Sequence, residues 1–137
     1  MAHSEEKKYS LEIMTPLKSV FEGDVESLIA QGVDGQFGVL VDHAPMLAAL
    51  EFGGLFMRRP GGEADWFVVS GGFFEVRRNR AALLVETCEV KEEIDIGRAQ
   101  EAMGRAKKRL AEREGIDVQR AEAALHRALG RIRTAAK

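Results

Sequence analysis

Through residues 9–86 the apolar residues form short runs or alternate with polar ones, and turn-forming residues interrupt them roughly every eight to twelve positions. This alternation predicts strands that bury one face. Their predicted ranges are 10–15, 19–22, 25–31, 36–41, 46–50, 54–59, 66–70, 73–77 and 81–87. Turns are expected at Thr15-Pro16, Val33-Asp34-Gly35, Pro60-Gly61-Gly62 and Arg78-Asn79. Because no helical period separates the strands, we expect an all-β sandwich or flattened barrel.

After residue 94 the spacing of apolar residues becomes helical, and the segment with this spacing occurs twice. Residues 94–110 recur, shifted by 22, as residues 116–132, with eight of seventeen positions identical. Asp95 and Asp117 occupy the N-cap positions of the two copies. The alanines recur at helical spacing, at positions 99, 102, 106 and 121, 124, 128. We therefore expect two amphipathic helices hinged at Arg113-Glu114-Gly115.

Together these patterns predict an α+β chain with two domains. Residues 1–89 form the sandwich, residues 90–137 form an antiparallel helical hairpin, and the two join near residues 90–93. The hairpin seam is mostly alanine, so at roughly 0.8 kcal/mol per buried CH2 it stabilises docking only modestly. Gly97, Gly104 and Gly130 weaken the helices by up to about 1 kcal/mol each relative to alanine. Opening is therefore expected to be easy, and each helix is about 25 Å long.

Antiparallel folding of this repeat brings like charges together. The expected facing pairs are Arg98 with Arg131, Arg109 with Arg120, and Arg105 with residues 124–127. Glu101, four residues before Arg105, and Asp117 offset this only partly. No acid follows Glu122, so the later cations must point into water or meet an anion or an acidic partner. These cations are Arg127, Arg131, Arg133 and Lys137.

Charge divides the chain in the same way. Residues 1–90 hold 8 Lys or Arg against 14 Asp or Glu, whereas residues 91–137 hold 12 against 8. A basic balance of the nucleic-acid-binding kind is therefore absent from the chain as a whole. The single Cys88 excludes an internal disulfide framework and fits a reducing compartment. Neither a run long enough to cross a bilayer nor a signal-peptide pattern in residues 1–10 is present, so we expect no direct bilayer insertion.

Catalytic constellations are not apparent in the sequence. The three histidines, His3, His43 and His126, have no metal-ligand spacing, and no nucleophile–base arrangement or paired carboxylates can be proposed. Trp66 and the neighbouring phenylalanines are expected in the core or an interface. Enzymatic activity is not expected, and no metal or cofactor is required.

Several segments, in order and spacing, resemble the epsilon subunit of bacterial and chloroplast F-type ATP synthase. They are residues 11–16 (LEIMTP), 20–25 (VFEGDV), 35–40 (GQFGVL), 43–47 (HAPML) and 69–76 (VSGGFFEV), followed by the two Ile-Asp-x-x-Arg-Ala helix starts. The resemblance implies a β-sandwich followed by a helical hairpin, in agreement with the periodicities.

The resemblance implies a rotor subunit in proton-driven ATP synthesis, peripheral to the membrane at the cytoplasmic face of the bacterial inner membrane. Its sandwich would bind the gamma subunit and rest on the c-ring. Its hairpin would either fold down or extend along gamma and inhibit ATP hydrolysis by contacting an acidic segment of a catalytic β subunit. The residues assigned to that contact are Arg120, Arg127, Arg131 and Arg133.

Some members of the family bind ATP as a regulatory ligand at the folded hairpin. The matching residues here are Glu89, Asp95, Arg98, Arg105, Arg127 and Arg131. Arg98 and Arg105 are two helical turns apart on one face, which suits phosphate groups. Asp95 also has a sufficient explanation as an N-cap.

Departures from the family pattern affect the c-ring contact. Val41-Asp42 stands where Pro or Pro-Gly usually precedes the histidine, and Gln36 stands where an acid is common. The c-ring-facing loop is predicted to comprise Asp34, Gly35, Gln36 and His43.

Two other functions stay open from the sequence. One is a stand-alone nucleotide-sensing module. The other is a nucleic-acid adaptor with a basic helical tail, against which the acidic β half and the lack of aromatic residues in the tail argue.

Overall fold

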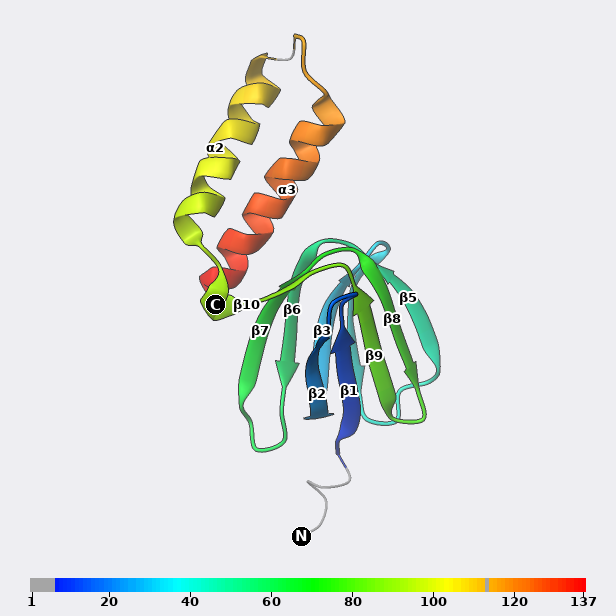
Figure 1. Cartoon of the computed structure of the whole chain (residues 1–137). Coiled ribbons are helices and arrows are strands. Elements are labelled where there is room, and N and C mark those ends of the chain that lie inside the picture. Colours follow the sequence, from blue (N-terminus) through cyan, green and yellow to red (C-terminus); the bar gives the residue numbers. More distant parts are fainter. Residues whose placement is uncertain (1–6, 113) are drawn as a thin grey trace.

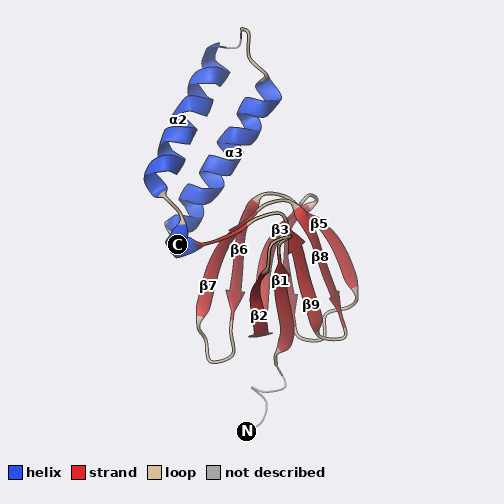
Figure 2. Ribbon diagram, viewed as in Figure 1, coloured by secondary structure: helices blue, strands red, loops and turns tan. Residues whose placement is uncertain are grey.

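The computed structural model describes residues 7–112 and 114–137, with a strand-rich N-terminal part and two long helices after it (Figure 1, Figure 2). The strands are β1 Tyr9–Met14, β2 Ser19–Val25, β3 Ser27–Gly32, β4 Gly35–Leu40, β5 Met46–Leu50, β6 Gly53–Arg58, β7 Ala64–Val69, β8 Gly72–Arg77, β9 Arg80–Val85 and β10 Cys88–Val90. A 3-10 helix, η1 Lys91–Glu93, leads to helices α2 Ile96–Glu112 and α3 Val118–Ala135. The predicted fold class, a β-sandwich followed by a helical hairpin, is confirmed.

The strands form one sheet that curls into a sandwich around a single core. Its order is β10-β7-β6-β3-β5-β8-β9-β1-β2, with β4 paired to β3; β1 and β9 are parallel. Alternate residues of β1, namely Tyr9, Leu11 and Ile13, point into the core, as the alternating pattern predicts. The Tyr9 hydroxyl donates a hydrogen bond to the Val39 carbonyl at 2.8 Å, and burial raises its pKa.

Most strand boundaries shift from the predicted ranges by one or two residues, and the structure differs further in three respects. β2 continues to Val25, three residues beyond its predicted end, and β3 begins at Ser27, two residues after its predicted start. β9 ends at Val85, before the predicted end at residue 87. A tenth strand, β10, pairs antiparallel with β7. A segment of three residues is too short to show an alternating pattern. Its pairing with β7 is what defines it as a strand.

Side-chain hydrogen bonds and left-handed backbone form the turn next to His43. Arg78 and Asn79 both have positive φ, 50° and 59°, between β8 and β9, where the sequence predicts a turn. Asp42 is also left-handed, with φ 63°. Its N–H donates to the Asn79 side-chain oxygen at 2.7 Å, and the Asn79 amide donates back to the Asp42 carboxylate at 2.9 Å. The departure at Val41-Asp42 is thus accommodated by a reciprocal bond between two turns.

Both predicted N-caps are confirmed. The Asp95 carboxylate accepts from the Arg98 N–H at 3.0 Å, and the Asp117 carboxylate accepts from the Arg120 N–H at 3.1 Å. Between the helices Gly115 takes the left-handed conformation with φ 68°; Arg113 of the predicted hinge lies outside the described residues. The buried residues of the helices are Ala99, Ala106, Ala121, Ala128 and Thr134, so the predicted alanine seam is present.

The helical hairpin stands at one end of the sandwich, and the C-terminal half of α3 makes most of the contact (Figure 1). Thr134 is buried near Gly54 of β6. At the C-terminus the Lys137 ammonium lies 5.3 Å from the centroid of the Trp66 ring, and Lys91 donates to the Lys137 carbonyl. Trp66 packs on Phe56 at 4.6 Å between ring centroids and therefore belongs to the edge of this contact.

Replacing Asp117 by Ala should lower the free energy of unfolding of the hairpin by about 1 kcal/mol, because the first turn of α3 loses its cap. Urea unfolding followed by far-UV circular dichroism measures this change. Gln119→Ala, on the exposed face of the same turn, is the matched control. Equal effects of the two substitutions would show that the cap contributes nothing.

Candidate ligand cleft between the helices

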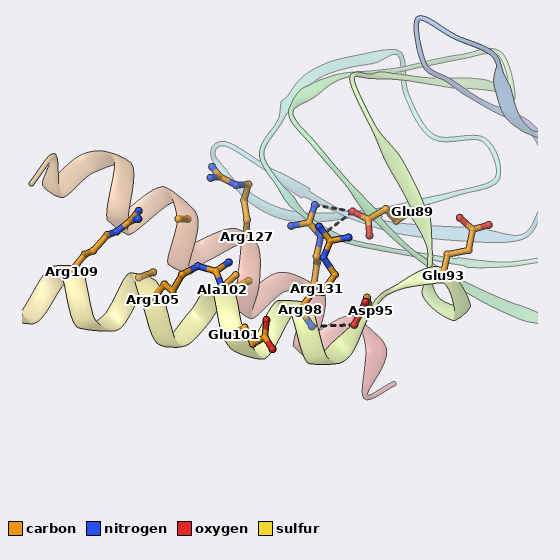
Figure 3. Close-up of a pocket in the computed structure, with 14 residues that line it drawn as sticks. Glu89, Glu93, Asp95, Arg98, Glu101, Ala102, Arg105, Arg109, Arg127 and Arg131 are labelled. Carbon is orange, nitrogen blue, oxygen red and sulfur yellow. Dashed lines mark hydrogen bonds and ion pairs between the residues drawn. The ribbon is translucent and has the colours of Figure 1, made fainter.

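A cleft of about 770 Å³ opens between α2, α3 and the segment that joins the sandwich to α2 (Figure 3). We call it the interhelical cleft. Its charged lining residues are Glu89, Glu93, Asp95, Arg98, Glu101, Arg105, Arg109, Arg127 and Arg131. All six residues that the resemblance assigns to ATP are among them. The remaining lining residues are alanines: Ala99, Ala102, Ala106, Ala124 and Ala128.

Helical spacing explains how the arginines come together. Arg98 and Arg105 are seven residues apart on α2, and Arg127 and Arg131 are four apart on α3, so each pair lies on one face of its helix. The alanines between them are too small to fill the space between the helices. Charged side chains therefore surround a space that is also lined by alanines.

Arg131 has an internal anionic partner. Its Nη2 lies 2.8 Å from Glu89 Oε1, and its Nε donates to the same oxygen at 2.9 Å. Its guanidinium carbon also lies 5.1 Å from the centroid of the Phe52 ring, within the range of a cation–π contact. Arg131 therefore meets an anion, one of the outcomes expected from the sequence, because β10 places Glu89 beside α3.

The other arginines of the interhelical cleft are not neutralised in this way. Within residues 7–112 and 114–137, no carboxylate lies within 4.0 Å of the guanidinium nitrogens of Arg98, Arg105, Arg109 or Arg127. The Asp95 carboxylate accepts the Arg98 backbone N–H instead of pairing with its side chain. Close cations in one cleft repel one another, so a bound polyanion would lower this repulsion and gain charge-assisted hydrogen bonds.

The arginines assigned to an inhibitory contact occupy different places. Arg127 and Arg131 line the interhelical cleft, whereas Arg120 and Arg133 do not. Arg120 lies with Arg109 and Asp117 around a second hollow of about 310 Å³ near the hairpin turn. Arg133 is exposed. The predicted facing of Arg98 with Arg131 and of Arg109 with Arg120 agrees with these shared hollows.

The predicted c-ring-facing loop is not one loop. Asp34, Gly35 and Gln36 lie in or beside the turn before β4, at the hairpin end of the sandwich, where Gln31 bonds Gln36. His43 follows the other end of β4. Four further residues of β4, which span about 13 Å, and a two-residue turn separate Gln36 from His43. The four residues therefore do not form one loop, and their contact with the c-ring stays a prediction that requires a surface along β4.

Phe52, His126 and Lys137 were not identified from the sequence as contributing to this region. Phe52 follows β5 in a turn, and its carbonyl accepts from His126 Nε2 at 3.0 Å. Glu51 Oε1 lies 3.9 Å from the same histidine nitrogen. A single aromatic residue in a glycine-containing turn gives no periodic signal in the sequence. Its packing partner, Gly130, is 78 residues further along the chain, so local patterns cannot reveal the contact.

No group of three or more metal-ligating side chains is placed to hold a metal ion within the part of the chain that the structure describes. None of its helices there is long and apolar enough to span a membrane. Cys88 is half-buried in β10, and burial, together with the nearby carboxylates of Glu89 and Glu93, raises its pKa to about 11.

Comparison with known proteins gives the family. The model of the ATP synthase delta/epsilon chain β-sandwich domain matches residues 8–91, and that of the long α-helix domain of the same chain matches residues 92–136. The chain therefore belongs to the ATP synthase delta/epsilon chain family. Membership confirms the resemblance seen in the sequence, and with it the expectation of a non-catalytic ATP synthase subunit.

Individual relatives agree with the family models. The ATP synthase epsilon chain of Pelotomaculum thermopropionicum is 44% identical over 108 residues, which cover 79% of this chain and 80% of the relative. That of Nitratidesulfovibrio vulgaris is 46% identical over 107 residues, which cover 78% and 79%.

The fold is also found in solved structures of mitochondrial ATP synthases. A chain in the Euglena gracilis enzyme superposes with a TM-score of 0.80 at 22% identity, over 88% of this chain and 76% of that one. A chain in the central stalk and c-ring structure from Tetrahymena thermophila gives 0.60 at 16% identity, over 93% and 92%.

Alkylation of Cys88 in the native chain should rise about tenfold per pH unit up to about pH 10 without levelling, because only the thiolate reacts and its pKa is raised to about 11. In denaturant the rate should instead level off above about pH 8.5, the ordinary pKa of a cysteine thiol. Since the folded chain holds this proton more tightly, Cys88 contributes stability at neutral pH that is lost as pH rises toward 11. A native rate that levels near pH 8.5 would contradict this account.

Proposed function

We propose that this chain is the epsilon-type subunit of a proton-translocating F-type ATP synthase, working in the central stalk between the c-ring and the catalytic head. The family models that match both halves of the chain support this, as do the relatives named ATP synthase epsilon chain. Its partners are the gamma subunit and the c-ring, both bound by the sandwich. The bacterial relatives support a location at the cytoplasmic face of the inner membrane, peripheral to the bilayer.

The proposed division of labour follows the two halves of the chain. Residues 1–89 form the rigid part that binds gamma and the c-ring, and residues 90–137 form the regulatory hairpin. The charge asymmetry supports this division, because the excess of basic residues lies in the second half. So does the small contact between them, which is made largely by the C-terminal half of α3 against β6 and β7 (Figure 1).

The hairpin is proposed to bind ATP in the interhelical cleft. The observation that carries this proposal is a cleft of about 770 Å³ with four arginines free of ion pairs within the described residues. Arg98, Arg105 and Arg127 would take phosphate oxygens. Glu89 and Asp95 would accept hydrogen bonds from an amino group or a ribose hydroxyl. Because these groups come from both helices and β10, ATP would favour the docked hairpin by mass action.

In the extended state the hairpin is proposed to inhibit ATP hydrolysis through its cations. Arg120, Arg127, Arg131 and Arg133 would then face an acidic segment of a catalytic β subunit. Extension must break the Arg131–Glu89 ion pair and the Arg131–Phe52 contact. ATP in the cleft would hold two of these cations, Arg127 and Arg131, and so oppose inhibition, which makes the two ligands of the hairpin mutually exclusive.

ATP should raise the melting temperature of the isolated full-length chain, and Arg105→Ala should remove most of this effect, since Arg105 reaches into the cleft and forms no internal ion pair. At one hundred times the dissociation constant the stabilisation is about 2.7 kcal/mol. Calorimetric titration with ATP measures the affinity directly. Arg133→Ala, outside the cleft, is the matched control and should bind ATP like the parent. A parent chain that shows neither heat nor a melting shift with ATP would contradict the proposal.

Arg120→Ala combined with Arg133→Ala should weaken inhibition of ATP hydrolysis in the assembled enzyme while leaving ATP binding by the isolated chain unchanged. Neither residue lines the interhelical cleft, so the two roles of the cations separate. The loss should be larger at low salt, because exposed charge pairs are screened. Steady-state hydrolysis by enzyme reconstituted with each variant gives the result. Equal inhibition by variant and parent at every salt concentration would remove these arginines from the contact.

A further inference from the structure

The base of α3 meets the sandwich through a knob and a notch. The Phe52 side chain is the knob and lies against α3 at Gly130, between His126 and Arg131 of that helix. A Cβ atom on Gly130 would lie only 3.1 and 3.3 Å from two carbons of the Phe52 ring. The absent side chain of Gly130 therefore makes the notch that receives Phe52.

A second glycine allows the close approach beside this one. A Cβ atom on Gly54 of β6 would lie 2.9 Å from Thr134 Oγ1, one helical turn beyond Gly130. Gly104 of α2 is different, since no atom beyond its chain neighbours and the backbone of its own helix lies within 4 Å of the position its Cβ would occupy. The sequence alone explains Gly104 and Gly130 alike, as residues that weaken a helix. The structure gives Gly130 a packing role that Gly104 lacks.

Phe52 also supports the arginine that links the sandwich to the interhelical cleft. The guanidinium of Arg131 lies over the Phe52 ring, and its Nε and Nη2 both reach Glu89. The ring thus limits where Arg131 can go on one side while Glu89 holds it on another. Phe52 itself does not line the cleft, so its substitution removes no cleft residue.

The contacts of α3 with Phe52 divide between its backbone and its side chain. His126 Nε2 bonds the main-chain carbonyl of residue 52, so this contact does not depend on the side chain there. Substitution of Phe52 therefore tests the ring alone, and any loss of docking is assigned to its packing in the notch and its contact with Arg131.

We propose that Phe52 is a positioning residue, a size-matched latch with Gly130 that sets how strongly the helical hairpin docks on the sandwich and how Arg131 is presented to the interhelical cleft. This inference rests on the proposed function only in treating hairpin docking as regulatory. The latch itself is a property of the chain without any ligand, so it can be tested without ATP.

Hydrogen exchange of the α3 amides in the full-length, ligand-free chain tests the latch. Phe52→Ala should lower the protection of α3 by about 3- to 30-fold, since it loses both apolar packing and the cation–π contact. Phe52→Leu fills the notch without a π-face and should lie between the parent and Phe52→Ala. Trp66, the only tryptophan, lies beneath Lys137, so its fluorescence should change with the same rank order. Unchanged protection and emission in Phe52→Ala would overturn the proposal.

A double-mutant cycle isolates the notch. Gly130→Ala and Gly104→Ala both replace a helical glycine by alanine and gain the same helix propensity. Gly104→Ala should raise protection of the hairpin with or without Phe52. Gly130→Ala should lower protection of α3 when Phe52 is present and raise it in the Phe52→Ala chain, where no ring occupies the notch. Gly130→Ala behaving like Gly104→Ala in both chains would overturn the latch.

ATP affinity separates this inference from the proposed function. Phe52→Ala should weaken ATP binding because Arg131 is less well placed, although every cleft residue is retained. If the parent binds no ATP, the proposed ligand is wrong, while the exchange data still decide the latch. If the parent binds ATP and Phe52→Ala binds it equally well, Phe52 does not position Arg131, and this part of the inference fails.

Discussion

The contact between the base of α3 and one end of the sandwich is the constraint on which the rest of this structure depends. The seam between the two helices is mostly alanine, which buries little apolar surface and therefore stabilises the hairpin only weakly. What fixes the hairpin is a small set of interactions near residues 126–137, centred on Arg131, with Glu89 on one side and Phe52 on the other. A contact this small is suited to forming and breaking during function.

The same contact explains how the charge of the cleft arginines can be coupled to the position of the hairpin on the sandwich. Folding the repeated helix back on itself gathers arginines from both copies around one cleft, and Glu89 neutralises only one of them. The docked hairpin therefore retains mutual repulsion that an anion would relieve. In the proposed function, a polyanion in the cleft and an acidic protein surface outside it would offer the same relief in two different conformations. Competition between these two ligands would then follow from electrostatics alone.

Much of this could be predicted from the sequence, because local patterns determine it. The alternation in β1, the caps Asp95 and Asp117, and the facing arginines all follow from spacing along the chain. The tenth strand was missed because only its pairing with β7 defines it. The Glu89–Arg131 ion pair and the Phe52–Gly130 contact were missed because they join residues 42 and 78 positions apart. His43 and Gln36 do not share one loop, because the rest of β4 lies between them and carries the chain away from the turn before it.

The measurement that tests the account most directly is the distance between the hairpin turn and the sandwich, with and without ATP. Spin labels at Glu114 and Asp34, both exposed, in a full-length chain with Cys88 replaced by Ser report this distance by pulsed electron resonance. The account predicts that saturating ATP converts a distribution containing extended hairpins into one narrow population with the docked distance. An identical distribution with and without ATP, in a chain shown to bind ATP, would contradict it.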